Sequence, residues 1–244
     1  MKTVSLLCRG PSLKDVSLLP ICDTLILVNT WVDELNDPNI EKYISSHKNI
    51  IHSVTNNCGW HLMKDNGFYE KYNVKKILLP YVDLSACSPF DTRFSHKQHQ
   101  GNTLPLICDN KSLKNIKDRD GNKIPVELLT DKNIDDMVRT HRYDFCAPTS
   151  GVDCLLHSVN DLGADVVNII GMDFYDGFGY YSDSKRDDDT AIKQGLMDIG
   201  TPEKMKLFVC NFIEKHSNVI FNIFTMAELK NDIKNLNIIN VVKE

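Results

Sequence analysis

Short apolar runs of five or six residues recur along the chain, and longer segments between them place apolar residues every three or four positions. Runs of that length are typical of buried strands, whereas the longer period places apolar side chains on one face of a helix. The pattern predicts strands at residues 3–8, 24–29, 50–54, 76–79, 166–170 and 219–223. Strands that alternate with helices build a mostly parallel sheet with helices on both faces, so we expect a doubly wound, Rossmann-like α/β fold.

Two helices are clearly marked, at residues 151–162 and 202–215. Ser150 directly precedes the first of them, where its side chain can cap the N-terminus of the helix. Thr201 followed by Pro202 places a cap and then a proline at the start of the second. The C-terminal residues 226–244 alternate Lys and Asn with Leu and Ile, and they predict a helix followed by a short strand.

The 244 residues are enough for one domain with an insertion. Between residues 83 and 144 the periodicity weakens, with a turn signal at 120–122, which predicts a less regular insertion. A polar, Asp-rich stretch at 176–200 is longer than an ordinary connection, so we expect it to be a lid. We therefore expect residues 1–244 to form a single α/β domain with these two additions.

Composition and charge exclude several classes of protein. Apolar residues make up 42% and charged residues 25% of the chain, as in ordinary globular proteins. The net charge of −5 provides no general attraction for nucleic acid or an anionic membrane, so we expect no nucleic-acid partner. No apolar run approaches the length of about 18 residues that spans a bilayer, and Met1 to Cys8 lack the features of a signal peptide.

Eight cysteines without a C-x-x-C pair suggest reduced thiols, so we expect a cytoplasmic protein with at most a peripheral membrane contact.

The first candidate site follows the first predicted strand, at Arg9-Gly10-Pro11-Ser12. The first strand-to-turn junction of a doubly wound sheet lies at the ligand crevice, where small residues let the backbone approach a nucleotide. The segment has neither the G-x-G-x-x-G pattern nor the Gly-Lys-Ser/Thr of a P-loop. Taken alone, it is better explained by a turn that simply ends a strand.

A second candidate region surrounds the helix at 151–162. Thr149, Ser150 and Gly151 place hydroxyl and N–H groups at the helix N-terminus, where an anion is favoured, although an ordinary cap explains them as well. After the next strand, Asp173, Phe174 and Tyr175 lie at the carboxyl edge of the sheet, where this fold class binds ligands.

Together these segments resemble the bacterial sialyltransferases of glycosyltransferase family 42. The matching motifs occur in the same order over most of the chain: Gly10-Pro11-Ser12-Leu13, Asn29 after the second strand, Thr149-Ser150-Gly151-Val152, Gly171-Met172-Asp173-Phe174-Tyr175, and Tyr181 six residues later.

The resemblance implies an inverting transferase that takes a CMP-activated sialic acid, or a related nonulosonate, to a glycan hydroxyl. It implies that Tyr175 and Tyr181 donate hydrogen bonds to the departing phosphate. The nucleotide-binding set that we infer comprises Arg9, Gly10, Pro11, Ser12, Asn29, Asn56, Thr149, Ser150, Gly151, Asp173 and Phe174. Family members often assemble as homo-oligomers, so a homo-oligomer is also expected.

The sequence departs from the family where the catalytic base should be. The family has a His after an Ile-Gly, and this chain has Thr201 there, whose hydroxyl is not a general base near neutral pH. Ala147 replaces an Arg of the family, and Arg9 replaces an Asn. His141, between Arg139 and Arg142, is our candidate for a recruited base, although a solvated basic helix end explains the segment better when it is taken alone.

Metal binding has little support in the sequence. Asp187, Asp188 and Asp189 could replace the base or hold a divalent cation, but a solvated acidic turn explains them better. Cys87, His96, His99 and Cys108 lack the paired spacing of a zinc site. We expect no metal site and no required cofactor, with magnesium acting at most as a stimulant.

Two other functions stay open. The Gly-Pro-Ser-Leu start and the Gly-x-Asp strand end also resemble proteins like 6-hydroxymethylpterin pyrophosphokinase, which would use ATP and magnesium. The third hypothesis is a nucleotide-binding protein that has lost catalysis. Similarity of fold alone does not choose among the three.

Overall fold

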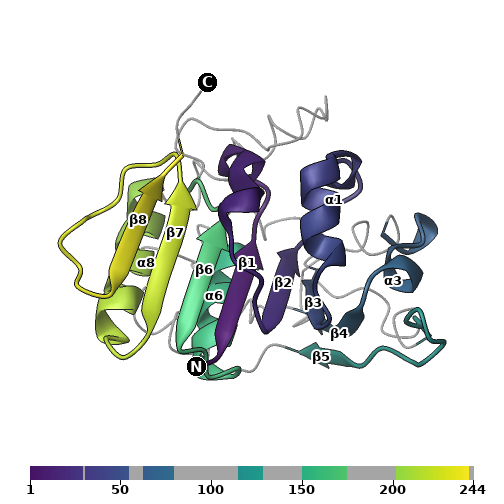
Figure 1. Cartoon of the computed structure of the whole chain (residues 1–244). Helices are drawn as coiled ribbons and strands as arrows, with labels where there is room; N and C mark the ends of the chain where they lie inside the picture. The colour runs from purple at the N-terminus through teal and green to yellow at the C-terminus, as the bar shows by residue number, and fades with distance from the viewer. Residues whose placement is uncertain (30, 55–62, 80–114, 129–149, 175–201, 242–244) are drawn as a thin grey trace, which may run out of the picture.

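The computed structural model describes residues 1–29, 31–54, 63–79, 115–128, 150–174 and 202–241. Within these ranges one sheet of eight parallel strands, in the order β5-β4-β3-β2-β1-β6-β7-β8, runs through the molecule (Figure 1). The strands are β1 (Thr3–Leu7), β2 (Thr24–Val28), β3 (Ile50–Ser53), β4 (Val74–Leu79), β5 (Val126–Leu128), β6 (Val166–Ile170), β7 (Ile220–Thr225) and β8 (Leu236–Asn240).

The strand order reverses direction between β1 and β6. From β1 the chain adds β2, β3, β4 and β5 on one side, whereas β6, β7 and β8 extend the sheet on the other side. In open α/β sheets this reversal leaves a crevice at the carboxyl ends of the two central strands, where ligands bind. Leu7 pairs with Ile170 across the β1–β6 junction, so the segments that follow these two residues begin side by side.

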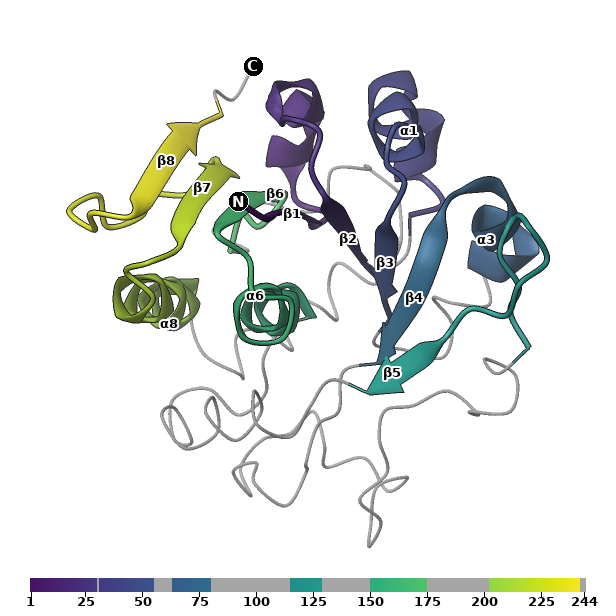
Figure 2. The same ribbon diagram turned by 60° about the horizontal axis from the view of Figure 1, so that its bottom comes forward.

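Helices cover both faces of the sheet, as the alternating pattern predicts. Figure 2 shows α6 (Ser150–Asn160) and α8 (Pro202–Lys215) on one face, with η1 (Pro11–Leu18) and α1 (Pro38–Ser45) on the other. The short elements η2 (Glu34–Asn36) and α3 (Phe68–Lys71) lie on the same face as η1 and α1. Each face has its own buried core, one around α6 and α8 and the other around η1, α1 and α3.

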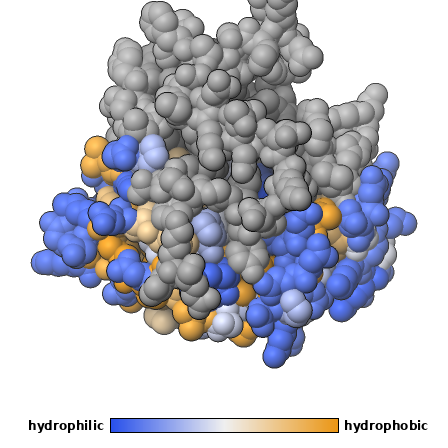
Figure 3. Space-filling model, turned by 90° about the horizontal axis from the view of Figure 1, so that it is seen from above, coloured by the Kyte–Doolittle hydropathy of each residue, from blue (hydrophilic) through white to orange (hydrophobic). Residues whose placement is uncertain are grey.

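Alternation along single strands explains the two cores. Val4 and Leu6 of β1 lie in the core with α6, whereas Leu7 lies in the opposite core with Leu13 and Val16 of η1. Successive side chains of a strand point to opposite faces, so a strand covered on both sides needs apolar residues at nearly every position. Polar side chains occupy much of the outer surface around the described elements (Figure 3).

All six predicted strands are present, with ends that differ by at most two residues. β8 confirms the short strand predicted near the C-terminus, but residues 226–235 form no helix. The sequence did not predict β5, which lies inside the segment expected to be an irregular insertion. The predicted turn at 120–122 is present, because Gly121 N donates to Asp118 O (3.0 Å) and Lys117 bridges to Lys123 in antiparallel fashion.

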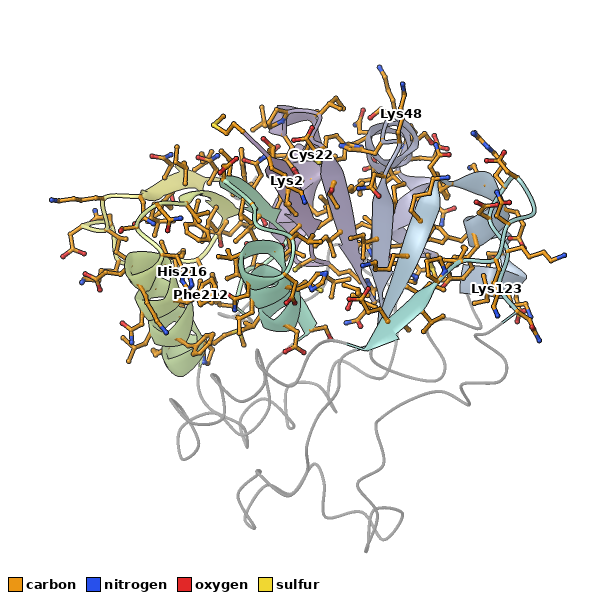
Figure 4. The ribbon with its side chains drawn as sticks, turned by 90° about the horizontal axis from the view of Figure 1, so that it is seen from below. Lys2, Cys22, Lys48, Lys123, Phe212 and His216 are labelled. Atoms are coloured by element: carbon orange, nitrogen blue, oxygen red, sulfur yellow. The ribbon has the colours of Figure 1, made fainter. Side chains whose placement is uncertain are left out.

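The helix ends agree with the sequence pattern in part. Helix α8 covers the predicted residues and starts with Pro202. Just beyond its far end, His216 Nδ1 lies 2.8 Å from Phe212 O, and the two rings are in contact at a tilt of 39° (Figure 4). Helix α6 begins at Ser150 itself, so this residue is the first of the helix instead of its cap. The helix ends at Asn160, two residues earlier than predicted, ahead of the left-handed Gly163 (φ 63°).

Candidate functional site

The segments that follow β1 and β6 stay paired beyond the ends of the strands. Cys8 N donates to Ile170 O (2.8 Å), and Gly10 N donates to Gly171 O (2.7 Å). Gly171 has φ 76°, a left-handed conformation in which a side chain would be strained, and a Cβ there would collide with the carbonyl of Cys8. The pairing therefore brings Gly10 and Asp173, predicted from separate motifs, to one place at the carboxyl edge.

Gly10 fits this place because it has no side chain. A Cβ on Gly10 would collide with the Asp173 carboxylate and would lie 2.6 Å from Gly171 O. Contacts that short are repulsive, so any larger residue would separate the two segments. The glycine of the Gly-Pro-Ser motif is thus required by close packing of the two strand ends in this structure.

Asp173 connects three segments at this edge. Its Oδ2 accepts a hydrogen bond from Ser12 N (2.8 Å), and its Oδ1 accepts from Thr225 Oγ1 (3.0 Å) and Met226 N (2.9 Å). The carboxylate is 3% exposed, so these bonds form away from most solvent competition. Sequence reasoning missed Thr225 and Met226, because only the pairing of β7 with β6 places them beside Asp173.

Ser12 completes the same hydrogen-bond cluster. Its Oγ accepts a hydrogen bond from Gly171 N (2.9 Å), and the residue is fully buried. Both the backbone and the side chain of Ser12 therefore hold the turn against the end of β6. The structure gives this residue of the predicted nucleotide set an internal role at the base of the site.

Arg9 lies in a buried ion pair beside this cluster. Its Nε lies 2.6 Å from Glu34 Oε1, and the side chains are 9% and 0% exposed. Two buried charges of opposite sign offset each other's loss of solvation only when both are present. Glu34, in η2, carried no sequence signal because it lies 25 residues from Arg9.

Asn29 adopts an unusual backbone conformation at the end of β2. Its φ is 66°, and its N–H donates to Ser53 O (2.8 Å) at the end of β3. Its own carbonyl lies 2.6 Å from Nε2 of the buried His52. Asparagine is among the few residues other than glycine that tolerate this region, which explains the residue type at this position.

The N-terminus of α6 lies at the same edge of the sheet. The helix packs against β1, β2 and β6 and leads into β6, so it runs antiparallel to the strands and begins at their carboxyl ends. Ser150 and Gly151 form its first turn, where N–H groups have no acceptor within the helix.

The Cys8 thiol, which follows β1, is neutral. Burial raises its pKa, and the nearby Cys154 and Asp173 raise it further.

Asp153 is an acidic residue of α6 that the sequence analysis did not single out. It is 6% exposed, and burial raises the pKa of its carboxyl well above the ordinary value. No charge or hydrogen bond from the described residues offsets this desolvation. A buried carboxyl of this kind can exchange a proton much closer to neutral pH than an exposed one. Its position in the first turn, at the edge that holds Ser150, was the available signal.

Phe174 follows Asp173 with φ 55°, and its ring is buried in the core formed with α6 and α8. Several predicted residues lie outside the described ranges. These are Asn56, His141, Thr149, Tyr175, Tyr181, Thr201, the Asp187–Asp189 cluster and the set Cys87, His96, His99 and Cys108.

Among the described residues, no group of three or more His, Cys, Asp and Glu side chains is placed to hold a metal ion. No helix in this part of the chain combines the length and apolar character that crossing a membrane requires.

Comparison with solved structures identifies the fold. No family model and no curated sequence matches the chain. The sialyltransferase CstII from Campylobacter jejuni, in complex with the substrate analogue cytidine-5'-monophosphate, is similar at a TM-score of 0.57 and 18% identity, covering 97% of this chain and 85% of that one. CstII in complex with CMP-3FNeuAc gives a TM-score of 0.55 at 17% identity, covering 97% of this chain and 94% of that one.

A CstII complex with a trisaccharide acceptor and CMP gives a TM-score of 0.51 at 18% identity, covering 98% of this chain and 89% of that one. The likeness at this level of identity is one of fold. The protein has the α/β fold of the CstII sialyltransferases.

Proposed function

We propose that the protein is a glycosyltransferase that moves a sialic acid, or a related nonulosonate, from a CMP-activated donor to a glycan hydroxyl with inversion. The observation that carries this proposal is the junction of β1 and β6, where Asp173 binds the turn at Gly10 and Ser12. The junction joins two family motifs, 161 residues apart, into one structure at the edge where this fold binds ligands.

The donor would lie across the carboxyl ends of β1 and β2. Gly10 lets the turn pack closely against Asp173 and Gly171 at this edge, and the N–H groups of the first turn of α6 at Ser150 and Gly151 favour an anionic group. Asn29 follows β2, the strand next to β1 in the sheet. The fold that the chain shares with CMP-bound CstII structures supports this placement.

The chemical step would need stabilisation of the leaving group and a base. In our proposal the phenols of Tyr175 and Tyr181 donate hydrogen bonds to the phosphate of CMP as it gains charge. The acceptor hydroxyl attacks the anomeric carbon from the opposite side, and its proton passes to a base while CMP leaves. His141 and the buried Asp153 are our main candidates for that base, and the Asp187–Asp189 cluster is a further one. No cofactor is needed in this scheme, and magnesium at most stimulates it.

Ligand-induced thermal stabilisation tests the donor class. A ligand of the folded state raises the melting temperature, so the purified protein is screened against CMP, CTP, CMP-sialic acid, ATP with magnesium, GDP and UDP. Selective stabilisation by cytidine nucleotides supports the proposal. Stabilisation by ATP with magnesium alone favours the pyrophosphokinase-like function, which the Asp187–Asp189 cluster and the absent base His also favour.

Variants at the two ends of α6 provide the matched control. Ser150→Tyr fills the first turn of the helix and should abolish the shift caused by CMP, whereas Asn160→Tyr, at the exposed far end, should preserve it. Release of CMP from CMP-sialic acid, with and without EDTA, then measures turnover and its dependence on metal. Stabilisation by no nucleotide, or an equal response of both variants, contradicts the proposed donor site.

A further inference from the structure

The side chain of His52 contacts the backbone of Asn29. Its Nε2 is 2.6 Å from Asn29 O, and its Nδ1 is 2.9 Å from the hydroxyl oxygen of Tyr69. His52 belongs to β3 and Tyr69 to α3, so the contact joins two core elements to the residue that ends β2. His52 is fully buried, which makes both of its ring nitrogens depend on these partners.

The hydrogen-bond directions follow from chemistry. Burial lowers the pKa of His52 to about 4, against a smaller opposing effect of the bond to Asn29 O, so the ring is neutral at physiological pH. A neutral imidazole has one N–H group and one lone pair. Because a carbonyl oxygen only accepts, Nε2 carries the proton and donates to Asn29 O, and Nδ1 accepts from the Tyr69 hydroxyl.

Neighbouring rings fix the imidazole in this orientation. The Phe68 ring lies 5.3 Å from that of His52, and the Tyr69 ring lies 5.6 Å from it, both tilted. Phe68 and Tyr69 are themselves buried in the core with α1. The donor that faces Asn29 therefore has little freedom to turn away.

The hydrogen bond to Asn29 O matters because the backbone of Asn29 is in the left-handed conformation. Left-handed φ values strain a residue other than glycine, and such a residue stays there only when other contacts hold it. The hydrogen bonds from Asn29 N to Ser53 O and from His52 Nε2 to Asn29 O do so here. Since φ sets the direction in which Cβ leaves the backbone, the same contacts set the direction of the Asn29 side chain.

We propose that His52 is a positioning residue of the donor site, whose Nε2–H holds the left-handed backbone of Asn29 and so directs the Asn29 side chain toward the nucleotide. This inference rests on the proposed function, in which Asn29 contacts the donor. It adds a residue from the core that no sequence motif marked, and it assigns that residue an effect on nucleotide affinity.

Substitutions that differ by one methylene test the contact. In His52→Gln the side-chain amide reaches the position of Nε2 and can donate to Asn29 O, whereas in His52→Asn it reaches only the position of Nδ1, facing Tyr69. We expect His52→Gln to bind CMP within about threefold of wild type and His52→Asn to bind it about tenfold more weakly, measured by calorimetry. Equal affinities in folded Gln and Asn variants overturn the proposal.

A double-mutant cycle separates positioning from general loss of packing. Asn29→Gly removes the side chain and keeps the left-handed backbone accessible. If His52 acts through Asn29, adding His52→Asn to Asn29→Gly changes CMP affinity by less than about twofold, although each single change weakens it. Full additivity overturns the positioning role.

The effect of His52 on the Asn29 backbone can also be measured without ligand. The ¹³Cα and ¹³Cβ chemical shifts of Asn29 report its backbone conformation, and we expect them to move in His52→Asn and to stay in place in His52→Gln. Unchanged shifts in both variants overturn the inference even if the wild type binds CMP. A wild type that binds no cytidine nucleotide overturns the proposed function, and with it the role of His52 at a donor site.

Discussion

The Asp173 carboxylate lies 2.8 Å from the backbone nitrogen of Ser12 and joins the end of β6 to the turn after β1. The other oxygen of the carboxylate accepts hydrogen bonds from Thr225 Oγ1 and Met226 N at the end of β7. One buried acidic residue thus fixes three neighbouring strand ends at the edge where the ligand crevice of this fold lies. The geometry of the proposed donor site therefore depends on Asp173 before any ligand binds.

Asp173→Asn should destabilise the protein by about 2 kcal/mol, because an amide cannot accept hydrogen bonds on both sides as the carboxylate does. Its NH₂ group would face either Ser12 N or the Thr225 and Met226 donors. The free energy of unfolding in urea measures the loss. Asp232→Asn, at an exposed residue, is the control and should change stability by less than about 0.5 kcal/mol. Equal stabilities of the two variants would show that the network contributes little.

Gly10→Ala should lower stability by about 2 kcal/mol or more, because the new methyl group would overlap the Asp173 carboxylate and Gly171 O. Gly121→Ala is the comparison, since Gly121 has φ 80° and open space around its Cβ position, so that only backbone strain is added. Melting temperatures of the two variants separate the effects. A smaller loss for Gly10→Ala than for Gly121→Ala would mean that the strand ends separate at little cost.

Asp153→Asn should stabilise the protein at neutral and higher pH. Burial raises the pKa of this carboxyl in the folded state, so the folded protein holds the proton more tightly than the unfolded chain. Its contribution to stability is full below the unfolded pKa and is lost as pH rises through the folded pKa. The melting temperature of Asp153→Asn minus that of wild type should therefore grow from pH 4 to pH 8.

A constant difference over this range would mean that Asp153 ionises normally in the folded protein. Turnover of the same variant has a separate meaning. A stabilised protein without transferase activity would support Asp153 as the base, and an active one would leave His141 and the Asp187–Asp189 cluster as the candidates.

Arg9→Met and Glu34→Gln should each cost about 3 kcal/mol, because each removes one partner of a buried ion pair. The double variant should be more stable than the sum of the single effects predicts, since neither charge then remains buried. Denaturation in urea of the four proteins completes the cycle. Additive losses would argue that the pair has no net coupling.

Tyr175→Phe and Tyr181→Phe should each reduce kcat by about tenfold or more and leave the Kd for CMP nearly unchanged, because the lost donors act mainly on charge that develops in the transition state. Turnover of CMP-sialic acid and calorimetry with CMP measure the two quantities. Unchanged turnover in the double variant would remove the leaving-group role from both phenols.

Particular residues show what the sequence could and could not predict. The strands around Val4, Ile26 and Val167 were predictable because they are buried on both faces and therefore mostly apolar. β5 was missed because it has three residues, too few for a periodic signal. At the candidate site, Gly10, Asn29 and Asp173 were recognised from motifs, but Glu34, His52 and Thr225 were not, because isolated polar residues in core elements carry no local pattern.

The sequence by itself determined the parallel α/β architecture, the places where strands end, and the motif residues at those ends, because periodicity and turn chemistry are local properties of the chain. Only the tertiary structure decided which distant groups meet: Ser12 with Asp173, Arg9 with Glu34, and His52 with Asn29. Those contacts depend on the order of strands in the sheet and on which side chains lose water together. No single segment of the chain determines either property.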